Sequence, residues 1–268
     1  MSKILPLLLA GFLFTWQCTD RISEPTEAEN KNVEPVDSQL FNIISPSQYG
    51  NKIQTDEGTF IDALFIDFEV SDVWAIYKLQ NGVAKKLSIE LSFDNPLQFI
   101  MFTDKYFDQN QIGHYAVYAA IPEDNSHTIE NITIAVAAVD DDELIRTYFE
   151  TVQPTRFGEI INTVEGDFIE AFFESFSAED VWGIQQTLHQ GTKARINIAR
   201  KLNRHLSYYL KNDSLADSLG NILSGVKVGL PYTPLSPIRN IEIFVSKAES
   251  TADSIDQNNR LIEQNRKE

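Results

Sequence analysis

The chain is poor in the residues that usually carry covalent or metal chemistry. It has one cysteine, Cys18, in 268 residues, so it cannot form an internal disulfide. Its four histidines, His114, His127, His189 and His205, show no metal-ligand spacing. The sequence also lacks the G-x-S-x-G, H-E-x-x-H and phosphate-binding glycine-loop motifs. We therefore expect no enzyme, and we expect packing of the 43% hydrophobic residues to stabilise the fold.

Cations are scarce as well. Lys and Arg number 22 against 39 Asp and Glu, which gives a formal net charge of −17. An exported protein of such acidity is a poor candidate for binding nucleic acid. The deficit is uneven, since residues 37–150 carry 19 acids and six bases, whereas residues 151–248 carry ten of each.

A long hydrophobic run is also missing. The apolar segment 4–14 follows Lys3 and has 11 residues, whereas a membrane-spanning helix needs about 20. It predicts an export signal over residues 1–17. Cys18 directly after it resembles the cysteine of a bacterial lipoprotein signal, and that resemblance implies an N-terminal Cys18 carrying acyl chains such as palmitate. Thr19 then implies anchoring in the outer membrane of the cell envelope. Ordinary secretion and an uncleaved anchor are the alternatives.

Two polar segments flank the folded part of the chain. Residues 19–36 contain no aromatic residue, so they cannot offset the entropy of ordering by burial. We expect residues 18–36 to be the lipidated cysteine and a flexible tether, and residues 249–268 to be a polar tail.

The main positive signal is an internal repeat. Residues 46–76 recur at 154–184 without a gap, and 15 of the 31 paired positions are identical. The match resumes later at an offset of 109, pairing Asn131 with Asn240. A repeat of this length indicates two copies of one domain. We predict a first repeat at 37–148 and a second at 149–248, each with its own core and with one inserted residue at the turn 189–191.

Strand signals dominate each repeat. Residues 131–136 and 240–245 keep apolar side chains two apart, and Asn81-Gly82 between two strand-like runs predicts a type I′ hairpin turn. The segments 59–69 and 167–177 are ambiguous. Their alternation favours strands, but their apolar residues also fit helical spacing, so α+β repeats with helices there are the alternative fold.

The segments together resemble the immunoglobulin-like and fibronectin-type-III-like domains of bacterial cell-surface lipoproteins. The residues that carry the likeness are Val70-Ser71-Asp72 before Trp74, and Ala178-Glu179-Asp180 before Trp182. The runs 113–118 and 134–140 add to it. The resemblance implies an all-β chain of two tandem Ig-like β-sandwich domains, with binding or spacing roles more often than catalysis. It also predicts that Trp74 and Trp182 pack in cores, with exposed ligand stacking as the alternative.

The segment 181–212 contains no acid and is rich in bases and aromatics. It predicts a surface for an anionic partner, such as a polysaccharide, a lipid headgroup or an acidic protein. A solvated basic face is the competing interpretation. A carbohydrate-binding surface module, which needs exposed tyrosines here, is the alternative function. The predicted partner-binding residues are Lys193, Arg195, Arg200, Lys201, Arg204, Tyr208 and Tyr209.

The consecutive acids Asp140, Asp141, Asp142 and Glu143 are the one candidate metal site. With Glu57 and Asp62 they could supply oxygen ligands to Ca²⁺; otherwise no cofactor is expected. The alternative is a capped helix start over 142–151. The sequence thus predicts a membrane-anchored envelope lipoprotein that acts as a non-catalytic binding, interaction or structural module. An envelope hydrolase is a further alternative.

Overall fold

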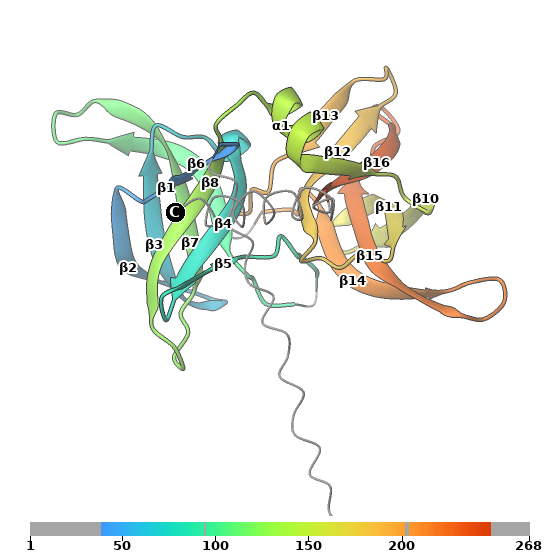
Figure 1. Cartoon of the computed structure of the whole chain (residues 1–268), viewed down its shortest axis with the longest axis horizontal. Helices are drawn as coiled ribbons and strands as arrows, with labels where there is room; N and C mark the ends of the chain where they lie inside the picture. The colour runs from blue at the N-terminus through green and yellow to red at the C-terminus, as the bar shows by residue number, and fades with distance from the viewer. Residues whose placement is uncertain (1–38, 94, 202–203, 248–268) are drawn as a thin grey trace, which may run out of the picture. The chain divides into compact units, whose positions relative to one another are not determined.

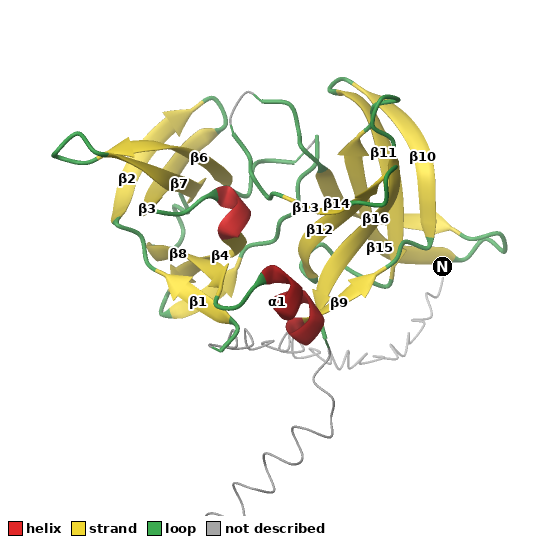
Figure 2. Ribbon diagram, turned by 90° about the horizontal axis from the view of Figure 1, so that it is seen from above, coloured by secondary structure: helices red, strands yellow, loops and turns green. Residues whose placement is uncertain are grey.

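The computed structural model describes residues 39–93, 95–201 and 204–247, which hold sixteen strands, one α-helix and one 3-10 helix. No helix in these ranges is long and apolar enough to cross a membrane. The first repeat contains β1 (Phe41–Ile44), β2 (Gln48–Thr55), β3 (Gly58–Ile66), η1 (Val70–Asp72), β4 (Val73–Gln80), β5 (Val83–Lys86), β6 (Ile100–Phe107), β7 (Gly113–Pro122) and β8 (Ile129–Ala137). The second contains β9 (Phe149–Val152), β10 (Arg156–Thr163), β11 (Gly166–Glu174), β12 (Val181–Leu188), β13 (Lys193–Ile196), β14 (Tyr209–Ala216), β15 (Ile222–Pro231) and β16 (Ile238–Ser246). Helix α1 (Asp141–Tyr148) joins the two and lies next to β9 (Figure 2).

The prediction of an all-β chain is confirmed, and the helical alternative at 59–69 and 167–177 is wrong. Both segments are strands, β3 and β11. Each is paired on both sides, β3 with β2 and β7, and β11 with β10 and β15. A central strand that is covered on both faces keeps apolar side chains on each, which explains why the alternation in these segments is imperfect.

The sixteen strands form four small antiparallel sheets, two from each repeat. Their strand orders are β1-β8-β4-β5, β2-β3-β7-β6, β13-β12-β16-β9 and β10-β11-β15-β14. Each strand of the first repeat has a counterpart in the same sheet position of the second, so that β1 corresponds to β9 and β8 to β16. Figure 1 shows the two sets in blue to green and in yellow to red. The duplicated sequence therefore produces a duplicated arrangement of strands.

The prediction of two separate Ig-like sandwiches, each with its own core, is wrong. The main hydrophobic cluster runs through both repeats. The backbones of Leu91 and Leu210 exchange hydrogen bonds of 2.7 and 2.8 Å, and those of Met101 and Arg200 exchange bonds of 2.6 and 2.8 Å. In each repeat the first strand pairs with the last strand, β1 with β8 and β9 with β16. The repeats are thus two halves of one interior.

The hairpin prediction at Asn81-Gly82 is confirmed. These two residues connect β4 to β5 with φ angles of 52° and 74°, as a type I′ turn requires. The second repeat has four residues, 189–192, in the same place, two more than the first. One residue fewer separates β13 from β14 than separates β5 from β6. The single net insertion is therefore an addition of two at the turn and a loss of one in the following loop.

The two repeated tryptophans pack between the repeats. Trp74 of β4 is 1% exposed, and its ring stacks on Phe149 at 5.0 Å and packs on Phe244 at 5.9 Å. Trp182 of β12 stacks on Phe41 at 5.6 Å. Packing, rather than exposed ligand stacking, is thus confirmed, but the partners of each ring belong largely to the other repeat.

Equivalent cations cover both tryptophans from the opposite repeat. Arg195 lies opposite Gln185 and Lys86 lies opposite Tyr77, which are matching positions in the two sheets. The Arg195 guanidinium is 4.0 Å from the ring centre of Trp74, and the Lys86 ammonium is 4.2 Å from that of Trp182. For Arg195, whose side chain is 13% exposed, such a cation–π contact contributes about 2 kcal/mol. The contact between the repeats is therefore reciprocal, as in a twofold dimer made within one chain.

Lys86 gives this contact a pH dependence. Burial lowers the pKa of its ammonium from 10.5 to about 8, although Asp180 and Glu179 act in the opposite direction. Between pH 8 and 10.5 the unfolded chain binds a proton that the folded chain lacks, so the free energy of unfolding rises with pH across this window. Relative to Lys86→Met, the wild type should gain about 1 to 2 kcal/mol between pH 7 and pH 9.5 in urea titrations. If the free energy of unfolding changed equally with pH in the wild type and in Lys86→Met, the prediction would be contradicted.

Candidate binding site

The basic stretch of the second repeat does not form one exposed face. Arg195 donates to the backbone oxygen of Val73 at 3.1 Å and to that of Ser71, and its Nε lies 3.6 Å from Asp141. Lys193 is paired with Glu242 at 3.0 Å. Two of the seven predicted partner-binding residues are thus engaged within the protein.

Of the other five predicted residues, four are also buried or in contact within the protein. The Lys201 ammonium lies 4.7 Å from the Phe102 ring, and burial lowers the pKa of Arg200. Tyr208 and Tyr209 are each 1% exposed, and the Tyr208 hydroxyl donates to the Ile89 oxygen at 3.1 Å. Among the seven predicted residues, only Arg204 is exposed and makes no such contact with another described residue. The expectation of exposed tyrosines for carbohydrate stacking is therefore wrong, because both rings are used in packing.

The four consecutive acids predicted as Ca²⁺ ligands lie at the start of helix α1. Asp140 is the N-cap of α1, and its Oδ1 accepts the Glu143 N–H at 2.8 Å. Asp141 Oδ1 accepts the indole N–H of Trp74 at 3.0 Å. Within the described ranges no three His, Cys, Asp or Glu side chains come together as a metal group, and this holds for Asp142, Glu57 and Asp62 too. The lipidation residue Cys18 and the tail 249–268 lie outside the described residues.

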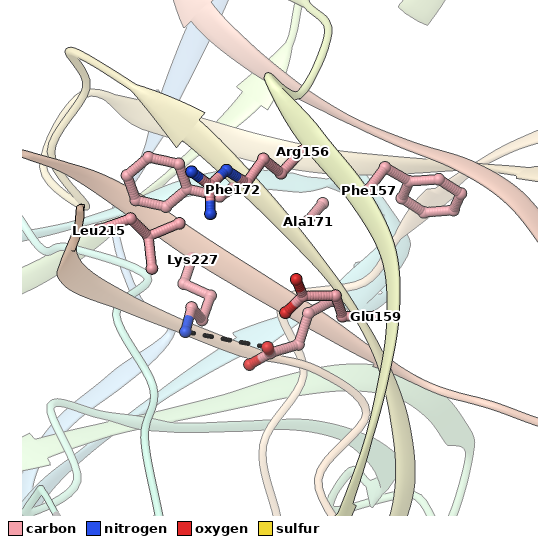
Figure 3. A pocket seen from close by; sticks show the side chains of 8 residues that line it. Arg156, Phe157, Glu159, Ala171, Phe172, Leu215 and Lys227 are labelled. Atoms are coloured by element: carbon pink, nitrogen blue, oxygen red, sulfur yellow. Dashed lines mark ion pairs between the residues drawn. The ribbon is translucent and has the colours of Figure 1, made fainter. Parts of the chain in front are cut away.

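A hollow opens on the sheet β10-β11-β15-β14 of the second repeat. The space in it that no atom fills is about 310 Å³, open solvent included, and Figure 3 shows its side chains. They come from four adjacent strands, so the sheet itself fixes their relative positions. The lining residues are Arg156, Phe157, Glu159, Glu170, Ala171, Phe172, Leu215 and Lys227.

Strand register explains why charged and apolar side chains meet here. Arg156 lies opposite Phe172, and Glu159 lies opposite Glu170. The bulge between these two pairs is made possible by Gly158, whose φ is +104°. On the next strand Lys227 pairs with Phe172. One face of the sheet thus carries two cations, two carboxylates and a phenyl ring within a few residues.

Two glycines on β15 provide the space for aromatic rings. A Cβ atom at Gly225 would overlap the Phe172 ring, at 2.7 Å from its Cζ, and one at Gly229 would overlap the Tyr209 ring. Tyr209 therefore lies flat across the backbone of β15, with its hydroxyl at Glu170. Without these glycines neither ring could hold its present position.

Two of the four charged side chains at the hollow, Glu170 and Lys227, are already paired. Glu170 is only 8% exposed, and its Oε1 accepts the Tyr209 hydroxyl. The Lys227 ammonium lies 3.8 Å from Glu170 and 3.0 Å from Asp213. Burial raises the pKa of Tyr209, and the bond to Glu170 adds to the rise. Burial also acts to raise the pKa of Asp213, but hydrogen bonds from Lys227 and the Ser214 backbone outweigh it and lower that pKa.

Two charged side chains at the hollow stay accessible. Arg156 is exposed, and one of its N–H groups donates to the Ala216 oxygen at 3.1 Å, which leaves the others available. Glu159 is exposed, and its carboxylate makes no hydrogen bond or ion pair with another described residue. The hollow therefore offers one free guanidinium and one free carboxylate above the rings and chains of Phe172 and Leu215.

The residues that line the hollow differ between the repeats. Six of the lining positions fall in the segment 154–184, and only Ala171 matches its counterpart in the first repeat. Of the other 25 positions of the segment, 14 are identical. Gln48 stands in place of Arg156 and Asn51 in place of Glu159. This site was not predicted from the sequence, although the contrast between the two copies marks its position.

No family model matches the chain, and no curated protein or solved structure matches it significantly.

Proposed function

We propose that the protein is an exported bacterial lipoprotein, anchored through Cys18, that acts in the cell envelope as a non-catalytic binding module. The partner is held in the hollow of the second repeat, and an acidic group of that partner meets Arg156. The two repeats together form the rigid support of this site. The polar segment 18–36 acts as the tether that holds the support away from the membrane.

The observation that carries the proposal is the state of the charged groups at the hollow. Glu170 and Lys227, which could otherwise act as acid and base, bind Tyr209, Asp213 and each other. General acid–base catalysis needs a group that is free to exchange a proton with a reactant. Of the two groups that remain accessible, an arginine guanidinium does not exchange its proton near neutral pH, so the carboxylate of Glu159 has no second free acid or base beside it. Recognition is therefore the chemistry that this arrangement favours, in preference to the hydrolase alternative.

The anchoring part of the proposal is tested by fractionation. We expect the wild-type protein to incorporate a labelled palmitate analogue and to appear in the envelope fraction. Cys18→Ser should lose the label and move to the soluble fraction, because no acyl chain is attached. Equal labelling of both proteins would contradict anchoring through Cys18.

The binding part is tested by crosslinking and recovery from intact envelopes. The double variant Arg156→Gln/Glu159→Gln should recover at most about a tenth of the partner, since charge-assisted hydrogen bonds contribute about 1.5 to 3 kcal/mol each. Gln48 occupies the position of Arg156 in the first repeat, so glutamine is compatible with the fold. The matched control is Arg239→Gln/Glu150→Gln, which changes exposed charges elsewhere on the second repeat. Equal recovery of an envelope partner with all three proteins, together with no small-ligand binding that depends on Arg156 or Glu159, would overturn the proposed site.

A further inference from the structure

The two free charges at the hollow have opposite signs and sit at different ends of it. Arg156 is in register with Phe172, and Glu159, beyond the bulge, is in register with Glu170. A ligand with only negative charge would meet Arg156 but would also face two carboxylates. A ligand with only positive charge would face Arg156 and Lys227. Since like charges in close contact are repelled, the arrangement favours a ligand that carries both signs.

The floor of the hollow limits that ligand further. It contains Phe172, which is 3% exposed, and Leu215, which is half-buried. An apolar side chain of the ligand can cover these residues.

We propose that the hollow binds a free amino acid with an apolar side chain, as a zwitterion. The ligand's carboxylate pairs with the guanidinium of Arg156, whose planar donors match a carboxylate. Its ammonium group pairs with Glu159, and its side chain lies over Phe172 and Leu215. This inference rests on the proposed function, because it names the class of partner that the same site would hold.

Three compounds separate the contributions of the ligand's groups in calorimetric titrations of the full protein. The first is leucine, the second is 4-methylpentanoate, which lacks the amine, and the third is 3-methylbutylamine, which lacks the carboxylate. We expect leucine to bind at least tenfold more tightly than either analogue. In Glu159→Gln, leucine should bind no more tightly than 4-methylpentanoate, whose own affinity should be unchanged. In Arg156→Gln, leucine should bind no more tightly than 3-methylbutylamine. The control Arg239→Gln should leave the affinities of all three compounds unchanged.

Each other outcome overturns a distinct claim. Binding of 4-methylpentanoate as tight as that of leucine would show an anion site, which overturns the zwitterion but leaves the proposed function in place. If none of the three compounds binds, while recovery of an envelope partner still depends on Arg156 and Glu159, the amino-acid inference fails alone. If that recovery is also independent of the two residues, both the inference and the proposed site fail.

Discussion

Replacing Trp74 by alanine should lower the free energy of unfolding by about 3 to 5 kcal/mol, the usual loss for a buried tryptophan. The ring is 1% exposed and fills the contact between the repeats, against Phe149 and Phe244. Its removal also leaves Arg195 without the ring at 4.0 Å and Asp141 without the indole N–H at 3.0 Å. Urea unfolding followed by far-UV circular dichroism measures the loss without relying on tryptophan fluorescence.

Two matched variants show which contacts of Trp74 matter. Trp182→Ala removes the equivalent ring, which is 8% exposed, and should cost less because Trp182 makes no indole hydrogen bond among the described residues. Trp74→Phe keeps an aromatic ring near Phe149 but loses the bond to Asp141, so it should cost about 1 to 2 kcal/mol. A loss below 1 kcal/mol for Trp74→Ala would mean that the contact between the repeats does not stabilise the fold.

The local features of the fold were predictable because they depend on neighbours in the sequence. The alternation at 131–136 and 240–245 gave strands β8 and β16, and Asn81-Gly82 gave the β4–β5 turn. Asp72 and Asp180 make local turn contacts of the same kind. Each accepts a backbone N–H three residues earlier, at 2.8 Å from Glu69 and 2.7 Å from Ser177. In all these cases the relevant atoms are within a few residues of one another.

The contact between the repeats was not predictable in the same way. A buried tryptophan has the same pattern around it whether it packs within its own sheets or against another copy. The sequence around Trp74 and Trp182 therefore indicated burial but not the partner. The basic segment 181–212 misled for a related reason, since its Arg195 is an exposed charge until the first repeat covers it. Long-range pairing decided both cases.

The candidate site depended on register across strands. Arg156, Glu170 and Lys227 are far apart in the sequence and belong to three strands, so no short motif joins them. The bulge at Gly158 also shifts the alternation of β10, which hides the fact that Arg156 and Glu159 line the same hollow. The available signal was the loss of identity between the copies at these positions, and it identifies a place rather than a ligand.

Gly229→Ala should be the most damaging substitution at the site, lowering the free energy of unfolding by about 3 to 5 kcal/mol. The added Cβ would occupy the space of the Tyr209 ring. Displacing that ring would remove the hydroxyl donor from Glu170, which is 8% exposed. Because the floor of the hollow would shift as well, any ligand of the hollow should bind more weakly. Thermal and urea unfolding measure the first effect, and titration measures the second.

The first repeat supplies the compensating change. There Ala120 occupies the position of Gly229, and its neighbour across the strands is Ile100, where the second repeat has Tyr209. A branched chain at that position leaves room for a Cβ, whereas a phenol lying across the strand does not. Tyr209→Ile combined with Gly229→Ala should therefore be more stable than Gly229→Ala alone, which gives a coupling energy of about 1 to 3 kcal/mol in a double-mutant cycle. Strictly additive losses would show that the glycine is required for another reason than the space that it gives to Tyr209.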